Sequence, residues 1–255
     1  MNKILLLLTF PLFMNCQNKQ NRTLIWSDEF EGNKLNAENW NFVIGNGCPG
    51  LCGFGNNELQ VYTNQNHTVE NGMLTIKTQY KDSVYSSTRI HSQNKQSFQY
   101  GYFEVRAKLP TGEGIWPAFW LLGNNIKEVG WPMCGEIDVL EYVGKTPSII
   151  HTSLHTKDSH GKTINTKETK INNIEQGFHL YAVDWTPEKM DFYIDHQKVY
   201  TFNPIVKNEK TWPFNQPFYI LLNVAVGGNF GGPKVDNQMF PQEFVIDYVR
   251  VYKNE

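Results

Sequence analysis

The 255-residue chain carries 23 Lys and Arg against 25 Asp and Glu, a formal net charge of -2. This near balance gives no strong positive field, so nucleic acid is excluded as an expected partner. Hydrophobic residues make up 40% of the chain and aromatic residues 14%, which is enough to bury the core of one large domain. We find no internal repeat, low-complexity region or second domain, and we expect one unit that is monomeric.

The N-terminus is typical of an export signal. Lys3 supplies a positive charge, and residues 4–14 form an apolar run too short to span a bilayer. Cys16 follows, an arrangement that resembles a bacterial lipoprotein signal whose cysteine is lipidated. Asn15 stands where a small residue is usual, so ordinary secretion is the alternative. We therefore interpret residues 1–16 as a signal peptide, 17–23 as a linker and 24–255 as the exported domain, held at an outer membrane on its periplasmic or outer face, or secreted.

Three cysteines remain after Cys16. Cys48 and Cys52 enclose a Pro-Gly turn, a spacing compatible with a local disulfide in an oxidising compartment. Cys134 stands alone, and no histidine lies at ligand spacing from these thiols. A zinc site built from them is therefore not expected.

Short strand signals separated by turn residues recur along the chain, and no segment predicts a helix longer than a turn or two. In residues 100–109 the apolar side chains alternate with polar ones, which predicts one core face and one solvated face. Residues 157–176 are polar and predict a loop. The last strand, residues 244–252, is apolar on both faces and is expected at a central position. The pattern is typical of an all-β antiparallel β-sandwich or barrel.

An acidic stretch within an apolar strand pattern is the main chemical feature. Glu136 and Asp138 share a strand face, but Glu141 falls on the opposite face unless a bulge adds one residue between Asp138 and Glu141. With the bulge, the two glutamates lie roughly 13 Å apart between Cα atoms at ~3.3 Å per residue. Inward-leaning carboxyl groups could then reach the ~5–5.5 Å of retaining glycosidases. The alternative is an exposed edge strand with solvated acids, but nearby tryptophans favour sugar cleavage.

The stretch EIDVLE at residues 136–141 resembles the bulged acid motif of family 16 glycoside hydrolases, in the laminarinase-type (endo-β-1,3-glucanase) branch. Leu140 stands where methionine is commoner in the motif. The resemblance extends over the whole domain, through WSDEF (26–30), NNELQ (56–60), GYFE (101–104), WPAFWLL (116–122), LNVAVGG (222–228) and DYVRVY (247–252).

This resemblance implies a β-jelly-roll with a substrate cleft over its concave sheet and a retaining mechanism that uses no cofactor. Glu136 would be the nucleophile and Glu141 the acid/base. Asp138 would share a proton with Glu136 and help to hold Glu141 protonated, because neighbouring like charges raise a pKa.

The resemblance also implies substrate contacts, each of which has an alternative structural role in the core or on the surface. Asn57 and Arg89 would be polar contacts on the glycone side, Trp116 and Trp120 stacking platforms, Trp131 a neighbour of the reacting sugar, and His155 a residue facing the acid/base. A structural Ca²⁺ far from the cleft is implied as well. Its oxygen ligands would be the carbonyls of Glu31 and Gly72 and the side chain of Asp247.

We therefore expect an endo-acting enzyme that cleaves β-1,3-glucan of the laminarin type by double displacement. The alternatives are a relative of the same family acting on mixed-linkage glucan, agar or carrageenan, and a non-catalytic glycan-binding lectin on the same fold. A lectin would have no use for Glu136 and Glu141 together. Membrane attachment is expected only through a lipid on Cys16.

Overall fold

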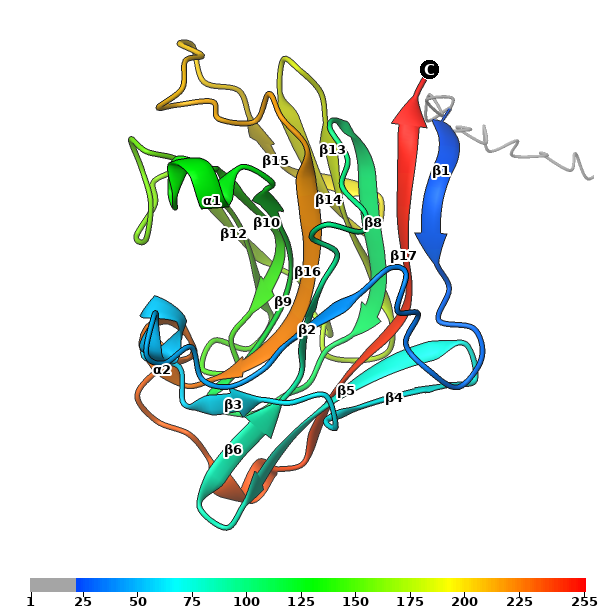
Figure 1. Ribbon diagram of the computed structural model, residues 1–255, viewed down its shortest axis with the longest axis vertical. Coiled ribbons are helices and arrows are strands. Elements are labelled where there is room, and N and C mark those ends of the chain that lie inside the picture. The colour runs from blue at the N-terminus through cyan, green and yellow to red at the C-terminus, as the bar shows by residue number, and fades with distance from the viewer. Residues whose placement is uncertain (1–21) are drawn as a thin grey trace, which may run out of the picture.

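Residues 22–255 of the computed structural model are described, and they form two β-sheets packed face to face (Figure 1). The pairings are antiparallel except for the parallel pair β3 (Gln60–Tyr62) and β6 (Val84–Ser87). The predicted all-β antiparallel sandwich is confirmed.

The ten-stranded sheet has the order β15-β14-β13-β8-β17-β5-β6-β3, with β1 added to β17 and β4 to β5. Its other strands are β1 (Arg22–Asp28), β4 (His67–Glu70), β5 (Met73–Lys81), β8 (Gly101–Lys108), β13 (His179–Trp185), β14 (Met190–Ile194), β15 (Gln197–Phe202) and β17 (Gln242–Asn254). The last strand, β17, is central in this sheet, as predicted. It does not lie between packed layers, because only one of its faces is buried and the residues of the other face are partly exposed.

The seven-stranded sheet has the order β12-β11-β10-β9-β16-β7-β2. Its strands are β2 (Asn41–Val43), β7 (Arg89–His91), β9 (Ile115–Gly123), β10 (Glu136–Tyr142), β11 (Ile149–His155), β12 (Thr166–Lys170) and β16 (Phe218–Val226). This sheet is curved, and the acidic stretch forms β10 near its middle (Figure 1).

Helices are short, as predicted. They are α1 (Ile126–Val129), α2 (Gly228–Gly231) and the 3-10 turns η1 (Cys52–Gly55) and η2 (Asn237–Met239). Figure 1 shows α1 and α2 on the open side of the curved sheet, near its opposite ends. Loops therefore border the concave face at both ends of its strands.

The core lies between the two sheets. Phe103 of β8, Phe119 of β9 and Phe244 of β17 are fully buried there, and Trp185 packs against both Phe103 and Phe218. Burial of several large aromatic side chains, each worth about 1.5–3 kcal/mol in transfer from water, fixes the two sheets against each other. The concave face is left free for polar groups.

Two further sequence predictions need correction. The second face of β8 is not fully solvated: Tyr102 and Glu104 are buried, because the Arg22 guanidinium covers the Tyr102 ring and the Tyr252 hydroxyl donates to Glu104. Residues 157–176 are not only loop, since β12 pairs with β11 along the sheet edge. Its residues are polar because most of this edge strand is exposed.

The cysteines are placed as follows. Cys48 and Cys52 are joined by a disulfide, and Cys134 is a buried free thiol. Cys16, together with the signal peptide and most of the linker, lies outside the described residues, so export and lipidation stay predictions. Among residues 22–255 no helix is long and apolar enough to cross a membrane.

The chain segment after β10 passes so close to a neighbouring loop that only glycine fits. An ideal Cβ on Gly144 would lie 1.7 Å from the Gly112 carbonyl oxygen, and the Gly144 N–H donates to the Ile115 carbonyl at 3.0 Å. Gly144 thereby connects the end of the acidic strand to the start of β9.

We predict that Gly144→Ala lowers stability by about 1–3 kcal/mol or more, the cost of overpacking, which is several degrees in Tm for a chain of this size. The matched control is Gly50→Ala, where the nearest atom to the new methyl group is 3.9 Å away. Thermal unfolding followed by circular dichroism measures both. Equal Tm values for the two variants would contradict the close approach.

Candidate active site

The bulge in β10 is present and lies where the sequence predicts it. Against β11, Asp138 pairs with Ser153 and Glu141 with His151, so two residues of β10 oppose one of β11. Against β9, the register shifts between Asp138 and Leu140. Because of this extra residue, Glu136, Asp138 and Glu141 all lie on the concave face.

A row of polar and aromatic groups extends from the acids across the sheet. Glu141 pairs with Ala118 of β9, Ala118 pairs with Asn223 of β16, and Asn223 pairs with Arg89 of β7. Directly paired residues share a sheet face, so Asn223 and Arg89 face the same cleft as Glu141. Trp116 and Trp120, two residues to either side of Ala118, lie on this face as well.

Each of the two glutamates accepts a hydrogen bond from a tryptophan. The Trp131 Nε1–H donates to Glu136 Oε2 at 2.7 Å, and the Trp116 Nε1–H donates to Glu141 Oε1 at 3.0 Å. Trp131 comes from the loop between α1 and β10 and is 43% exposed. Trp116 lies in β9 and is half-buried.

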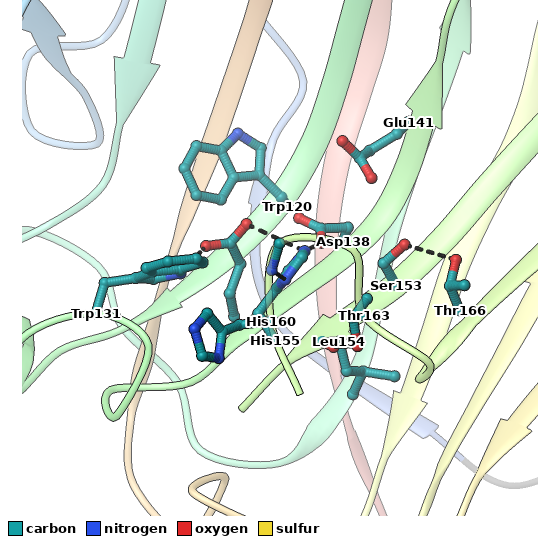
Figure 2. A network of polar contacts seen from close by, with 12 residues as sticks. Trp120, Trp131, Asp138, Glu141, Ser153, Leu154, His155, His160, Thr163 and Thr166 are labelled. Carbon is teal, nitrogen blue, oxygen red and sulfur yellow. Dashed lines mark hydrogen bonds and ion pairs between the residues drawn. The ribbon is translucent and has the colours of Figure 1, made fainter. Parts of the chain in front are cut away.

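His155 lies at the nucleophile end of the site, not opposite the acid/base as predicted. Its Nε2 is 3.1 Å from Asp138 Oδ2 and 3.9 Å from Glu136 Oε1, and Figure 2 shows it between Trp131 and Asp138. The physical reason is the register: β11 runs antiparallel to β10, so His155 pairs with Glu136 and the bulge puts His151 opposite Glu141.

The electrostatics of the site follow from burial and from charge crowding. Burial, together with the charge of Asp138, raises the pKa of Glu141 well above its usual value. Burial and Asp138 likewise raise the pKa of Glu136 to about 8, while His155 and the Trp131 N–H act in the opposite direction. Three acids this close cannot all ionise together, so the cluster retains a proton near neutral pH.

For His155, burial and the neighbouring acids act on the pKa in opposite directions. Burial lowers its pKa, but the hydrogen bond and the charge of Asp138, with the charges of Glu136 and Glu141, outweigh this effect and raise the pKa to about 9. The cation places positive charge beside Glu136 and favours the ionised form of that carboxyl group. In the cation Nδ1 also carries a proton, so the 3.1 Å approach of the Gly161 N–H to Nδ1 is a hydrogen bond only when the ring is neutral with its proton on Nε2.

Trp120 and Arg89 form a second part of the cleft. The Arg89 guanidinium lies over the Trp120 ring, 4.7 Å from its centroid, and 5.2 Å from that of Phe54. The Trp120 N–H donates to Asn223 Oδ1 at 2.8 Å. The Arg89 Nε is buried without a hydrogen-bond partner. An unpaired buried donor is costly, and a sugar hydroxyl is one group that could accept from it.

Asn57 and Glu58 lie in the loop that follows η1. Asn57 Nδ2 donates to Asn229 Oδ1 at 2.9 Å, which connects this loop to α2, and Asn57 is exposed. The carboxylate of Glu58 accepts from Gln60 and Tyr62. The structure places Arg89 in β7 and Asn57 in this loop, both near one end of the cleft. Asn57 is separate from the acids.

The opposite end of the cleft carries small hydroxyl groups and a second imidazole. Ser153 and Thr166 share a hydrogen bond of 2.9 Å, beside Asp138 (Figure 2). The His160 ring meets the Trp131 ring edge-on, with centroids 5.3 Å apart. Thr166 and His160 are exposed, and glycan hydroxyl groups can bind to such donors and acceptors.

Sequence reasoning missed three residues of the site. Asn223 accepts from Trp120 and donates to the Tyr62 hydroxyl at 3.2 Å; the signal was a single amide in the otherwise apolar strand β16. His151 is buried opposite Glu141, and its Nε2 has no partner. Phe230 of α2 packs edge-on against both Trp116 and His151, and no sequence pattern indicated this.

Within residues 22–255, the only group of three or more His, Cys, Asp or Glu side chains close enough to hold a metal ion is part of the acid cluster. Potential ligand atoms of Glu136, Asp138 and His155 lie within 4.8 Å of one another. His155 Nε2 forms ion-pair contacts with Asp138 and Glu136, and Trp131 donates to Glu136, so charge pairing accounts for the arrangement of these three groups. Two carboxyl groups on one face, both with raised pKa values and Glu141 with its value well above the usual one, are suited to general acid and nucleophilic chemistry at a glycosidic bond.

Comparison with known proteins agrees with this geometry. The family described as glycosyl hydrolases family 16 matches residues 55–250. A crystal structure of laminarinase from Flavobacterium sp. UMI-01 is 61% identical with a TM-score of 0.89, covering 91% of this chain and 100% of that chain. The laminarinase catalytic domain from Thermotoga maritima MSB8 is 38% identical with a TM-score of 0.86, covering 92% and 99%. A beta-glucanase from Rhodothermus marinus is 38% identical over 248 residues, covering 90% of this chain and 85% of that protein. The chain therefore belongs to family 16 of the glycosyl hydrolases.

Proposed function

We propose that this domain is an endo-acting, retaining hydrolase of β-1,3-glucan of the laminarin type. The observation that carries the proposal is the bulge that turns Glu136 and Glu141 to one face of the concave sheet, each with an indole N–H donor. The names of the similar laminarinases support the choice of glucan.

In the proposed first step, Glu136 attacks the anomeric carbon and Glu141 protonates the departing oxygen. The glycosidic bond breaks, and a covalent glycosyl-enzyme forms. In the second step Glu141, now ionised, takes a proton from water, and this water releases the sugar from Glu136 with retention of configuration. Glu141 must therefore start protonated, which agrees with its burial and its raised pKa.

Asp138 and His155 would regulate the protonation of the two glutamates. Asp138 is 2% exposed and lies between them, so its charge opposes ionisation of either neighbour. His155 is 3.1 Å from Asp138 and compensates part of this charge. When Glu136 becomes esterified, the cluster loses one negative charge, and the pKa of Glu141 falls toward the value that a general base needs.

The substrate is tested by incubating the purified domain with laminarin, lichenan, agarose and κ-carrageenan and measuring new reducing ends. We predict the fastest release from laminarin, with the β-anomer appearing first by NMR. Glu136→Gln and Glu141→Gln, which keep side-chain volume, should each lower the rate by about 100-fold or more. Unchanged Tm values for these variants are the folding control.

Three outcomes would contradict this proposal in different ways. A fully active purified Glu136→Gln or Glu141→Gln variant would contradict the catalytic role proposed for that glutamate. No release from any of the four polysaccharides, with binding to laminarin retained, would instead favour the glycan-binding lectin. Preferred release from one of the other three polysaccharides would leave the mechanism and change the substrate.

The charge of Asp138 predicts the direction in which the pH profile should move when this residue is replaced. Its charge raises the pKa of Glu136 and of Glu141, so Asp138→Asn should lower both values. Activity requires ionised Glu136 and protonated Glu141, and both limbs of the kcat/KM profile should therefore move to lower pH. Asp82→Asn, in an exposed turn, is the control and should leave both limbs in place. A limb of the Asp138→Asn profile that moves to higher pH contradicts the charge effect.

We also propose that a structural Ca²⁺ is held by the carbonyl oxygens of Glu31 and Gly72 and by Asp247. The donors are all oxygen, which suits a hard cation. An ideal Cβ on Gly72 would lie 4.0 Å from the Glu29 carbonyl oxygen, so the Gly72 turn is close to the loop that carries Glu31. The pairing of Ile246 with Leu74 brings Asp247 to the level of this turn. Asp247 Oδ2 also accepts from Arg106, so a cation at this site would share the carboxylate with the guanidinium.

Removal of calcium should lower the Tm of the wild-type domain. At a concentration 100 times Kd, a bound cation stabilises the native state by about 2.7 kcal/mol, which is several degrees for this chain length. Differential scanning calorimetry with EDTA, and again after excess CaCl₂, measures the shift. Asp247→Asn should reduce the calcium-dependent difference. A wild-type Tm that does not change with EDTA contradicts the site.

A further inference from the structure

Two indole groups from different parts of the fold point their only polar atom at the two glutamates. Trp131 belongs to the loop after α1, and Trp116 belongs to β9, the strand beside β10. Their Nε1 atoms lie 2.7 Å from Glu136 Oε2 and 3.0 Å from Glu141 Oε1. A stacking platform alone would not require either contact.

The chemistry of the donor restricts what each carboxyl group can do. An indole N–H can only donate, so the oxygen that it contacts must accept. When Glu141 is protonated, its acid proton therefore belongs on Oε2, because Oε1 already receives the Trp116 hydrogen. In the same way Oε2 of Glu136 receives the Trp131 hydrogen, and Oε1, which lies 3.9 Å from His155 Nε2, is the oxygen available for attack.

The surroundings of both rings hold these donors in place. Trp131 is flanked by His155, with centroids 5.9 Å apart, and by His160. Its loop is fixed behind it by Gln216, whose Nε2 donates to the Cys134 carbonyl at 2.9 Å. Trp116 meets the edge of Phe230 at 5.3 Å. Each ring thus keeps its orientation before any sugar enters the cleft.

We propose that Trp116 and Trp131 are positioning residues that reserve one oxygen of each catalytic glutamate, so that Glu141 Oε2 delivers the proton and Glu136 Oε1 attacks. This inference rests on the proposed hydrolase function. Both N–H groups also favour the ionised carboxylate, and they oppose the effect of burial on the pKa of Glu136 and Glu141.

The test replaces each tryptophan with phenylalanine, which keeps an aromatic ring and removes the N–H. For Trp116→Phe we expect kcat on laminarin to fall about tenfold, one general-acid orientation effect, with KM changed less than about twofold. Loss of the donor raises the pKa of Glu141, which must be protonated, so the alkaline limb of the pH profile moves to higher pH and the acid limb stays.

For Trp131→Phe the acid limb of the pH profile should move. Loss of its N–H raises the pKa of Glu136, which must be ionised, so activity is lost at a higher pH as the solution is acidified. The alkaline limb should stay in place. Trp120→Phe is the matched control, because its N–H donates to the neutral Asn223 and not to an acid. This variant can change KM, but it should move neither limb.

The outcomes separate this inference from the proposed function. If Trp116→Phe and Trp131→Phe raise KM and leave kcat and both limbs as in the wild type, the rings are platforms only and the inference is wrong, while hydrolysis stands. If wild-type enzyme releases nothing from laminarin, the proposed function fails first. If Trp116→Phe does not fold, as judged by its Tm, the acid limb of Trp131→Phe decides the result.

Discussion

One extra residue in β10 determines the chemistry of the cleft. Side chains alternate along a strand, so without the bulge at Val139 and Leu140 the second glutamate would point into the core between the sheets. A charged or half-satisfied carboxyl group there would cost several kcal/mol. The bulge instead places three acids on the concave face, and the strands on both sides keep their apolar side chains in the core. The remaining features of the site depend on this shift.

Crowding of three carboxyl groups on one face has its own cost, which the neighbouring elements offset. Asp138 is almost fully buried, and Glu141 nearly so. His155 from β11 supplies a positive charge next to Asp138, and the two indoles supply donors to the outer acids. Three separate parts of the chain therefore hold the cluster in a state with fewer charges than acids, and this proton retention is the property that glycosidic bond cleavage uses.

Much of this arrangement could be predicted from residue spacing. The five-residue offset between Glu136 and Glu141 indicated the bulge, and the strand pattern indicated the sandwich. The partner of His155 could not be predicted correctly, because the bulge changes the register between β10 and β11 and puts His151 opposite Glu141. The strand β12 was missed because an exposed edge strand has no apolar alternation. The donor roles of Trp116 and Trp131 depend on ring orientation, about which sequence carries no information.

An indole is physically well matched to a carboxyl group that must alternate between acid and base. A lysine at the position of Trp116 would form an ion pair and lower the pKa of Glu141 until it no longer held a proton. A serine could rotate and accept from the protonated acid, so either oxygen could carry the hydrogen. The indole N–H has no charge and no acceptor, so it orients Glu141 in both protonation states and only moderately favours the anion.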